Sequence, residues 1–281
     1  MTLTRGSLLI AALACAASAQ DLDIPYRTVG GVTLRMDIAR PSGQGLFPAV
    51  VCLHGGGWSM GNKKSLRKVI QELASAGYVA ASVQYGLAPQ FHCRGQVSDV
   101  YEAIRFLRAH SSRWRVNRSQ VAVMGYSAGA HLALLAGFST DSAAPRVQAI
   151  IDVSGPTDLR DWRMQEPAER QLQSVTGKTS DRLVSDLLGQ TGRSGEIVDE
   201  ASPVTLVRPG LPPVLIFHWR GDVAVPMSQA ERLIQALDQN NIRHEVIWFN
   251  GRGHAMNGPG AERVVPETVR FLRAMFAPSP H

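Results

Sequence analysis

The stretch Gly125-Tyr126-Ser127-Ala128-Gly129 is the feature that most restricts how this chain can fold. It follows the apolar run 121–124 and precedes the apolar segment 130–135, so a strand is expected to end and a helix to begin around Ser127. A serine between two glycines at such a junction predicts a sharp, strained turn that exposes the hydroxyl above a sheet. Ser127 is therefore the candidate nucleophile.

A second glycine-rich motif is His54-Gly55-Gly56-Gly57-Trp58, which follows the strand-like segment 47–53. Consecutive glycines let backbone N–H groups turn toward a ligand without a side chain in the way. The negative oxygen that develops during acyl transfer requires donors of this kind. The motif therefore predicts an oxyanion-binding loop upstream of the serine.

Apolar patterning predicts alternating strands and helices along most of the chain. Residues 24–38 indicate two strands joined at Gly30-Gly31, an antiparallel hairpin at a sheet edge. Further strands are expected at 49–53, 78–83, 121–124, 147–153, 213–218 and 244–249, and helices at 66–76, 97–110, 130–135, 230–239 and 265–275. This order indicates an α/β fold with a mostly parallel central sheet, an antiparallel N-terminal hairpin and helices on both faces.

The segment 155–212 interrupts this alternation. It mixes polar helical patterns at 168–175 and 181–188 with glycine-rich turns. Because α/β folds bind ligands over the carboxyl ends of their strands, an insertion here is expected to form a small lid or pocket wall. The alternative is a surface excursion with no role in specificity.

Residues 1–19 have the features of a cleaved export signal. Arg5 supplies a positive start, residues 8–14 an apolar centre, and Ala17-Ser18-Ala19 a small-residue cleavage site. A buried N-terminal helix is the alternative, and the segment is too short to span a bilayer with this flank. We therefore expect a signal peptide followed by one domain, residues 20–281.

Export implies a secreted or periplasmic location for the mature chain. Cys15 offers a lipoprotein alternative, but Ala12 stands where such signals usually carry leucine. The two cysteines of the mature chain, Cys52 and Cys93, leave both a disulfide and free thiols open, and neither belongs to a metal-binding spacing.

The composition allows one large core and argues against a nucleic-acid partner. The chain has 281 residues, of which 44% are hydrophobic. Its net charge is +6, but the arginines are scattered and form no dense basic runs interleaved with aromatic residues. No surface for nucleic acid is therefore expected.

An activated serine needs a histidine to take its proton and a carboxylate to orient that histidine. His254 follows the last predicted strand, and Asp222 follows the strand before it, which gives the chain order Ser, Asp, His. Asp158, which follows the strand ending at Val153, preserves the same order and is the alternative acid.

Three further histidines have other expected roles. His131 is expected to pack in the helix after the serine, His218 to support the turn after its strand, and His54 to hold the glycine loop in place without taking a proton.

These motifs make the chain resemble serine esterases of the α/β-hydrolase superfamily. Within it, the chain is most similar to the compact feruloyl and acetylxylan esterase-like (BD-FAE-type) branch, near bacterial hormone-sensitive-lipase-like esterases. The resemblance runs from about residue 24 to 276 and rests on segments 54–58, 82–89, 125–129 and 201–204 and on the segments around Asp222 and His254.

The resemblance implies that Ser127 is the nucleophile, His254 the general base and then acid, and Asp222 its orienting carboxylate. It also implies an oxyanion hole made by the backbone N–H groups of Gly56, Gly57 and Ala128. The implied activity is that of a carboxylesterase working through an acyl-enzyme, with no metal or organic cofactor. Its expected substrates are short-chain esters or acetyl and feruloyl esters linked to plant polysaccharides.

The chain departs from the family pattern at two places. Gln84 and Gly86 stand where many relatives have aspartate and arginine, so the ionic support of that segment is expected to be missing. Relatives often have His-Gly before the acid, where this chain has His218-Trp219-Arg220-Gly221, which is expected to place Trp219 near the pocket rim. The lack of an N-terminal helical cap favours the compact branch.

Other functions of the same fold stay open. An aryl formamidase or a peptidase of the prolyl-oligopeptidase type carries similar motifs, although the chain has no room for a propeller domain and export argues against the formamidase. A catalytically silent binding protein is the third alternative, and such proteins generally lack one member of the serine, histidine and acid set.

Overall fold

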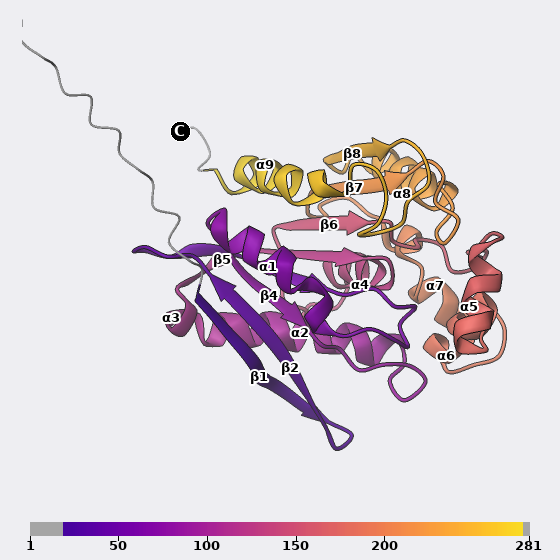
Figure 1. The fold of residues 1–281 in the computed structure, drawn as a ribbon, viewed down its shortest axis with the longest axis horizontal. Helices are drawn as coiled ribbons and strands as arrows, with labels where there is room; N and C mark the ends of the chain where they lie inside the picture. Colours follow the sequence, from indigo (N-terminus) through magenta and orange to yellow (C-terminus); the bar gives the residue numbers. More distant parts are fainter. Residues whose placement is uncertain (1–18, 278–281) are drawn as a thin grey trace, which may run out of the picture.

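The structure is a computed structural model that describes residues 19–277, so the expected signal peptide lies outside the described residues except for Ala19. Within this part, one eight-stranded sheet has the strand order β1-β2-β4-β3-β5-β6-β7-β8 (Figure 1). None of the described helices is both long and apolar enough to cross a membrane.

The strands are β1 (Ala19–Val29), β2 (Val32–Arg40), β3 (Phe47–Leu53), β4 (Val79–Val83), β5 (Val116–Tyr126), β6 (Ala149–Val153), β7 (Val214–Trp219) and β8 (His244–Phe249). The helices are α1 (Arg67–Ser75), α2 (Cys93–Ala109), α3 (Ser111–Trp114), α4 (Ala128–Gly137), α5 (Ala168–Thr176), α6 (Ser180–Leu188), α7 (Glu196–Glu200), α8 (Ser228–Gln239) and α9 (Val264–Phe276). Short 3₁₀ turns cover Lys63–Leu66, Pro203–Leu206 and Ala261–Arg263.

The sheet is antiparallel only at its N-terminal edge. Strands β1 and β2 form a hairpin around Gly30 and Gly31, both at positive φ, and β2 then pairs antiparallel with β4. The remaining pairs are parallel. The predicted α/β architecture and the predicted hairpin are therefore confirmed.

Helices cover both faces of the sheet. Helices α1 and α9 pack on one face, where the cluster includes Val50 and Met124, and α2, α4 and α8 pack on the other, with Val51 and Val123 (Figure 1). Successive strand residues thus enter opposite cores, which explains why the parallel strands are apolar at nearly every position.

Cys52 and Cys93 belong to different cores. Cys52 packs with the α1 and α9 layer, and Cys93 packs on the other face of the sheet. Both are buried, and neither forms a disulfide within residues 19–277. The sheet between them explains why the possible bridge does not form.

The insertion at 155–212 contains α5, α6 and α7, which lie together at one end of the molecule (Figure 1). Helix α6 buries Leu183, Val184, Leu187 and Leu188, whereas α5 has no buried residue. The two polar helical patterns predicted the positions of α5 and α6, but α7 was not predicted. Helix α6 therefore anchors the insertion to the core.

Helix α2 and strand β5 both begin earlier in the chain than the sequence predicts. Helix α2 begins at Cys93, four residues before the predicted Val97, and its first turn includes the polar Gln96, whose buried side chain donates to the carbonyls of Trp58 and Phe91. Strand β5 begins at Val116 and includes a polar stretch before its apolar run. Apolar periodicity detects neither feature.

Candidate active site

Ser127 occupies the turn between β5 and α4 at φ 54° and ψ −121°. This conformation is unfavourable for a residue with a Cβ and costs about 1–3 kcal/mol. The glycines on either side are sterically required: a Cβ at Gly125 would lie 2.1 Å from the oxygen of Gly129, and a Cβ at Gly129 would lie 2.3 Å from the oxygen of Leu53. The Ser127 N–H donates to the carbonyl of Val153 at 2.8 Å, which ties the turn to β6.

The structure brings Ser127, His254 and Asp222 into one hydrogen-bonded chain. His254 Nε2 lies 2.9 Å from Ser127 Oγ, and His254 Nδ1 lies 2.8 Å from Asp222 Oδ2. Because a carboxylate can only accept, His254 Nδ1 donates to Asp222, and Nε2 is left to accept the serine proton. The arrangement matches the geometry that serine nucleophiles need.

Asp222 is held by the turn that follows β7. Its Oδ1 accepts the backbone N–H groups of Ala224 and Val225, each at 2.9 Å. His218, at the end of β7, lies 2.8 Å from the carbonyl of Val225 through Nε2, so the histidine braces this turn. The predicted role of His218 agrees with this contact.

The alternative acid, Asp158, lies in a different network. Its carboxylate accepts from Arg160 at 2.7 Å on each oxygen and from Arg232 at 2.9 Å. Burial raises the pKa of this carboxyl, but the hydrogen bonds and charges of the two arginines hold the pKa of Asp158 below its ordinary value. Asp158 is thus engaged with arginines, while Asp222 is the acid beside His254.

The glycine loop lies directly against the serine turn, because a Cβ at Gly55 would be 3.2 Å from the Cβ of Ser127. Gly56 has φ 127° and Gly57 has φ 54°. Among the described residues, no hydrogen bond uses the N–H groups of Gly56, Gly57 or Ala128. Three free donors therefore lie in segments that flank the serine.

Trp58 anchors this loop through a contact that the sequence does not reveal. Its side chain is fully buried, and its Nε1 donates to His131 Nδ1 at 3.0 Å. His131 in turn donates from Nε2 to the carbonyl of Ala201 at 2.7 Å. Burial lowers the pKa of His131 to about 4, so the ring is neutral near pH 7 and can make both bonds. His131 therefore joins the glycine loop to the end of the insertion, beyond the predicted packing role.

His54 behaves as predicted. Its Nδ1 lies 2.8 Å from the carbonyl of Gly55, and its ring stacks on Tyr85 with the centroids 4.4 Å apart. Burial lowers the pKa of His54 to about 4, which keeps the ring uncharged near pH 7.

The segment that follows β4 has ionic support after all, contrary to the prediction from Gln84 and Gly86. The Gln84 side chain accepts the N–H of Lys63 at 3.1 Å, and the Lys63 ammonium pairs with Asp37. Arg67 also pairs with Asp37, at 2.7 Å. The charged groups come from other elements of the chain, which a local motif comparison cannot detect.

Gly86 is supported in the same way. Its N–H donates to Asp99 Oδ2 at 2.8 Å, and the other oxygen of that carboxyl pairs with Arg27 at 2.7 Å. A Cβ at Gly86 would lie 2.3 Å from the ring of Phe91, so this position leaves space for an aromatic side chain.

The prediction for Trp219 is wrong. Its side chain is fully buried, so it cannot line a rim open to solvent, and its Nε1 donates to the carbonyl of Pro259 at 2.9 Å. The reason is its place as the last residue of β7, where the side chain enters the core under the turn that carries His254.

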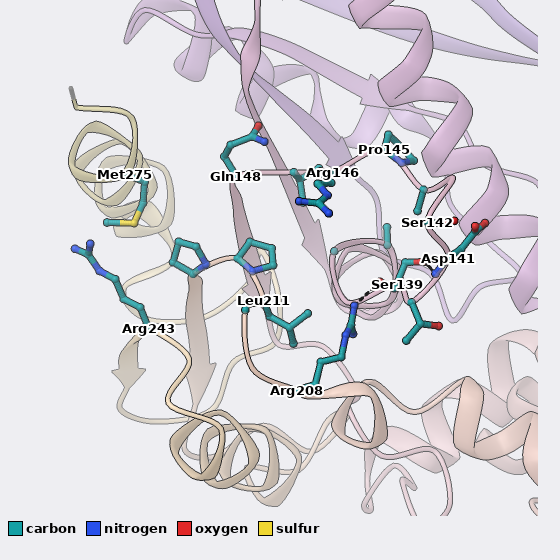
Figure 2. A pocket seen from close by; sticks show the side chains of 18 of the residues that line it. Ser139, Asp141, Ser142, Pro145, Arg146, Gln148, Arg208, Leu211, Arg243 and Met275 are labelled. Carbon is teal, nitrogen blue, oxygen red and sulfur yellow. Dashed lines mark hydrogen bonds between the residues drawn. The ribbon is translucent and has the colours of Figure 1, made fainter. Parts of the chain in front are cut away.

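A cavity of about 1060 Å³ lies at the amino-terminal ends of β6 and β7 (Figure 2), whereas Ser127 follows the carboxyl end of β5. It is lined by Gln148 and Pro213, which precede β6 and β7, and by three arginines. One of them, Arg208, donates to the carbonyls of Phe138 and Ser139 at the end of α4. This cavity is therefore separate from the hydrogen-bonded serine.

A smaller, apolar cavity of about 490 Å³ lies beside the insertion. Its lining includes Phe91 from the loop before α2, Leu188 from α6, Ile197 from α7 and Ala201. No cluster of three metal-ligating side chains occurs within residues 19–277.

Two curated relatives from Mycobacterium tuberculosis match most of this chain. It is 29% identical to esterase LipC over 252 residues, which is 82% of this chain and 60% of LipC. It is 28% identical to the probable carboxylic ester hydrolase LipM over 279 residues, which is 92% of this chain and 62% of LipM. The chain thus spans about three-fifths of the length of these relatives.

Among solved structures, esterase 2 of Thermogutta terrifontis in its apo form is similar, with a TM-score of 0.74, 23% identity, and coverage of 95% of this chain and 98% of that chain. This similarity establishes the α/β-hydrolase fold. The family model of BD-FAE matches residues 36–237, which run from within β2 to within α8 and include the serine turn and Asp222. Because that match covers well over half of the chain, the protein belongs to the BD-FAE family.

Proposed function

We propose that this protein hydrolyses carboxylic esters through an acyl-enzyme formed on Ser127. The observation that carries the proposal is the continuous chain from Ser127 Oγ through His254 to Asp222, with contacts of 2.9 and 2.8 Å. Membership of the BD-FAE family and the similarity to the esterase LipC and to the probable carboxylic ester hydrolase LipM support the same conclusion.

In the first step, Ser127 Oγ attacks the ester carbonyl carbon, and its proton passes to His254 Nε2. The carbonyl oxygen becomes negative and accepts from the N–H groups of Gly56, Gly57 and Ala128. These groups have no other acceptor within the described residues, so they can meet the oxyanion without breaking a bond. Asp222 stabilises the imidazolium that forms.

In the second step, protonated His254 gives its proton to the leaving alkoxide, the bond to the alcohol breaks, and the acyl group stays on Ser127. Water then enters, gives a proton to His254 and attacks the acyl carbon. Collapse of this second intermediate releases the carboxylic acid and returns the proton to Ser127 Oγ. The charge on Asp222 is held throughout by the N–H groups of Ala224 and Val225.

The packing around the glycine loop favours short acyl groups. A Cβ at Gly57 would lie 2.7 Å from Leu183 Cδ1 of α6, so that side chain already fills the space on one side of the loop. Trp58 is fully buried and contacts Trp162 edge to face, with centroids 5.4 Å apart. We therefore favour acetyl to butyryl esters, including acetyl esters linked to plant polysaccharides, and the bulkier feruloyl esters of plant polysaccharides are the second candidate.

The test is hydrolysis of a p-nitrophenyl ester series from acetate to palmitate by residues 20–281, together with methyl ferulate and acetylated xylan. Ser127→Ala should abolish hydrolysis. Ser154→Ala is the matched control, because Ser154 also has φ 54°, is buried, and has a hydroxyl without a partner among the described residues. It should keep wild-type turnover.

Covalent labelling with a fluorophosphonate separates the possible failures. Labelling of Ser127 with no ester turnover would refute ester hydrolysis and point to an amide or formamide substrate. Absence of labelling in a folded protein would refute Ser127 as a nucleophile and favour a silent binding protein. Export is tested separately, by fractionating cells that express residues 1–281 and sequencing the N-terminus of the product.

A further inference from the structure

The turn that carries His254 rests on two aromatic rings. We call residues 250–260, between β8 and the 3₁₀ turn before α9, the histidine turn. Beneath it, the rings of Trp219 at the end of β7 and Phe249 at the end of β8 lie 4.6 Å apart between centroids. Trp219 is fully buried and Phe249 is 3% exposed.

Trp219 touches the histidine turn on both sides of His254. A Cβ at Gly253 would lie 2.4 Å from Trp219 Cδ1, and a Cβ at Gly258 would lie 2.7 Å from Trp219 Nε1. At both positions the backbone itself therefore lies against the indole. The indole N–H also donates to the carbonyl of Pro259 at 2.9 Å.

These contacts bracket a narrow turn. His254 and Asn257 exchange two backbone hydrogen bonds, of 2.7 and 2.9 Å, so the residues between them cannot move independently of His254. Gly253 and Gly258 immediately flank His254 and Asn257, and both contact the indole of Trp219. The indole therefore sets the distance of His254 and Asn257 from the sheet.

The backbone of Trp219 also begins the turn that carries Asp222. The carbonyl of Trp219 accepts the Asp222 N–H at 3.2 Å, and the Gly221 N–H donates to the carbonyl of Gly251 in the histidine turn at 3.0 Å. One residue thus contacts both turns whose side chains meet between His254 Nδ1 and Asp222 Oδ2.

We propose that Trp219 is a positioning residue that sets His254 against Asp222 and Ser127 through its ring and its indole N–H. Trp219 touches none of the reacting atoms and acts only through the histidine turn. The proposal rests on the proposed function, because it takes His254 as the base of the reaction. A displacement of about 1 Å at a reacting group can cost about a hundredfold in rate.

The first variant is Trp219→Phe, which keeps an aromatic ring and loses the bond to Pro259. Its matched control is Trp114→Phe. Trp114 is also fully buried, and its Nε1 donates to Asp21 at 2.7 Å, but it lies in α3 and packs near β1, away from the histidine turn. We expect kcat of Trp219→Phe to fall about fivefold or more with KM within twofold, and kcat of Trp114→Phe to stay at the wild-type value.

The second variant tests the contact itself. Gly253→Ala adds a methyl group that must collide with the indole, so kcat should fall about a hundredfold. In a Trp219→Leu background the same substitution should cost less than about tenfold, because the colliding ring is gone. Equal costs in both backgrounds would overturn the proposal.

A spectroscopic readout keeps this test independent of turnover. The proton between His254 Nδ1 and Asp222 should give a downfield resonance in the proton NMR spectrum, which Trp219→Phe should shift or broaden and Trp114→Phe should leave unchanged. Wild-type protein that shows this resonance but hydrolyses no ester would refute the proposed function alone. An active Trp219→Phe protein with wild-type kcat and an unchanged resonance would refute the positioning role alone.

Discussion

Substitution of Gly56 by alanine should disable turnover while leaving the protein folded. The Cβ would lie 2.3 Å from the carbonyl oxygen of Met60 and 2.6 Å from its carbon, distances that no packed structure tolerates. Gly56 also has φ 127°, which alanine adopts only under strain. The backbone must therefore move.

The direction of that movement matters for the oxyanion. The carbonyl of Gly56 accepts the N–H groups of Ser59 and Met60 at 3.2 and 2.9 Å, so residues 56–60 form one tight turn that shifts as a unit. The N–H groups of Gly56 and Gly57 then leave the position that the proposed mechanism requires. Loss of one such donor costs about 3 kcal/mol of transition-state stabilisation, or about a hundredfold in kcat.

The assay is steady-state hydrolysis of p-nitrophenyl acetate, with kcat and KM reported separately and melting followed by circular dichroism. Gly210→Ala is the control, because Gly210 has φ 84° but nothing within 4 Å of the added methyl group, and it lines the cavity opposite the serine. It should lose about 1 kcal/mol of stability and no activity. If folded Gly56→Ala kept kcat within about threefold of Gly210→Ala, the oxyanion assignment would be refuted.

Three further outcomes follow from the structure. Asp222→Asn should lower kcat about 10⁴-fold, whereas Asp158→Asn should change kcat little and reduce the urea midpoint, because the arginines paired with Asp158 lose their charge partner. Burial raises the pKa of Asp152 to about 7 from its ordinary value of 3.8. Between pH 4 and 7 this carboxyl therefore ionises in the unfolded chain but stays protonated in the folded one, so its own contribution to stability falls as pH rises. Asp152→Asn should therefore stabilise the protein by up to about 4 kcal/mol more at pH 8 than at pH 4 in urea unfolding, and an equal effect at both pH values would contradict this. Burial also raises the pKa of the Cys52 and Cys93 thiols, so both should react with a disulfide reagent only after the protein unfolds. If the denatured mature protein showed fewer than two reactive thiols, the absence of a disulfide between Cys52 and Cys93 would be contradicted.

The parts of the fold that the sequence predicts well are those encoded by neighbouring residues. The serine turn needs glycine at 125 and 129 because a Cβ at either position would lie less than 2.5 Å from backbone atoms, and both glycines appear within five positions of the sequence. The hairpin at Gly30-Gly31 and the apolar strands of the sheet are local in the same sense. Local steric rules and burial patterns therefore suffice for them.

Contacts between distant residues were the ones that the sequence analysis missed. Trp58 and His131 are 73 positions apart and share one hydrogen bond in the core, while Trp219 reaches Pro259 across 40 positions. Nothing in the local pattern of a buried tryptophan says which backbone it will meet. The role of each side chain depends on the register of β7 against β8 and of β3 against β5, the strands that precede the glycine loop and the serine turn, and only the assembled sheet defines these registers.

The order of the residues along the chain cannot decide which aspartate orients His254. Asp158 and Asp222 both follow a strand of the parallel sheet and both precede His254, so order alone allows either. What separates them is the neighbourhood: Asp158 has two guanidinium groups on its oxygens, whereas Asp222 has two backbone N–H groups on one oxygen and offers the other to His254. A carboxylate already paired with arginine has little charge left to stabilise an imidazolium, while one held by neutral donors keeps its charge available. Backbone amides therefore suit an orienting acid better than arginines do, and the turn after β7 supplies them.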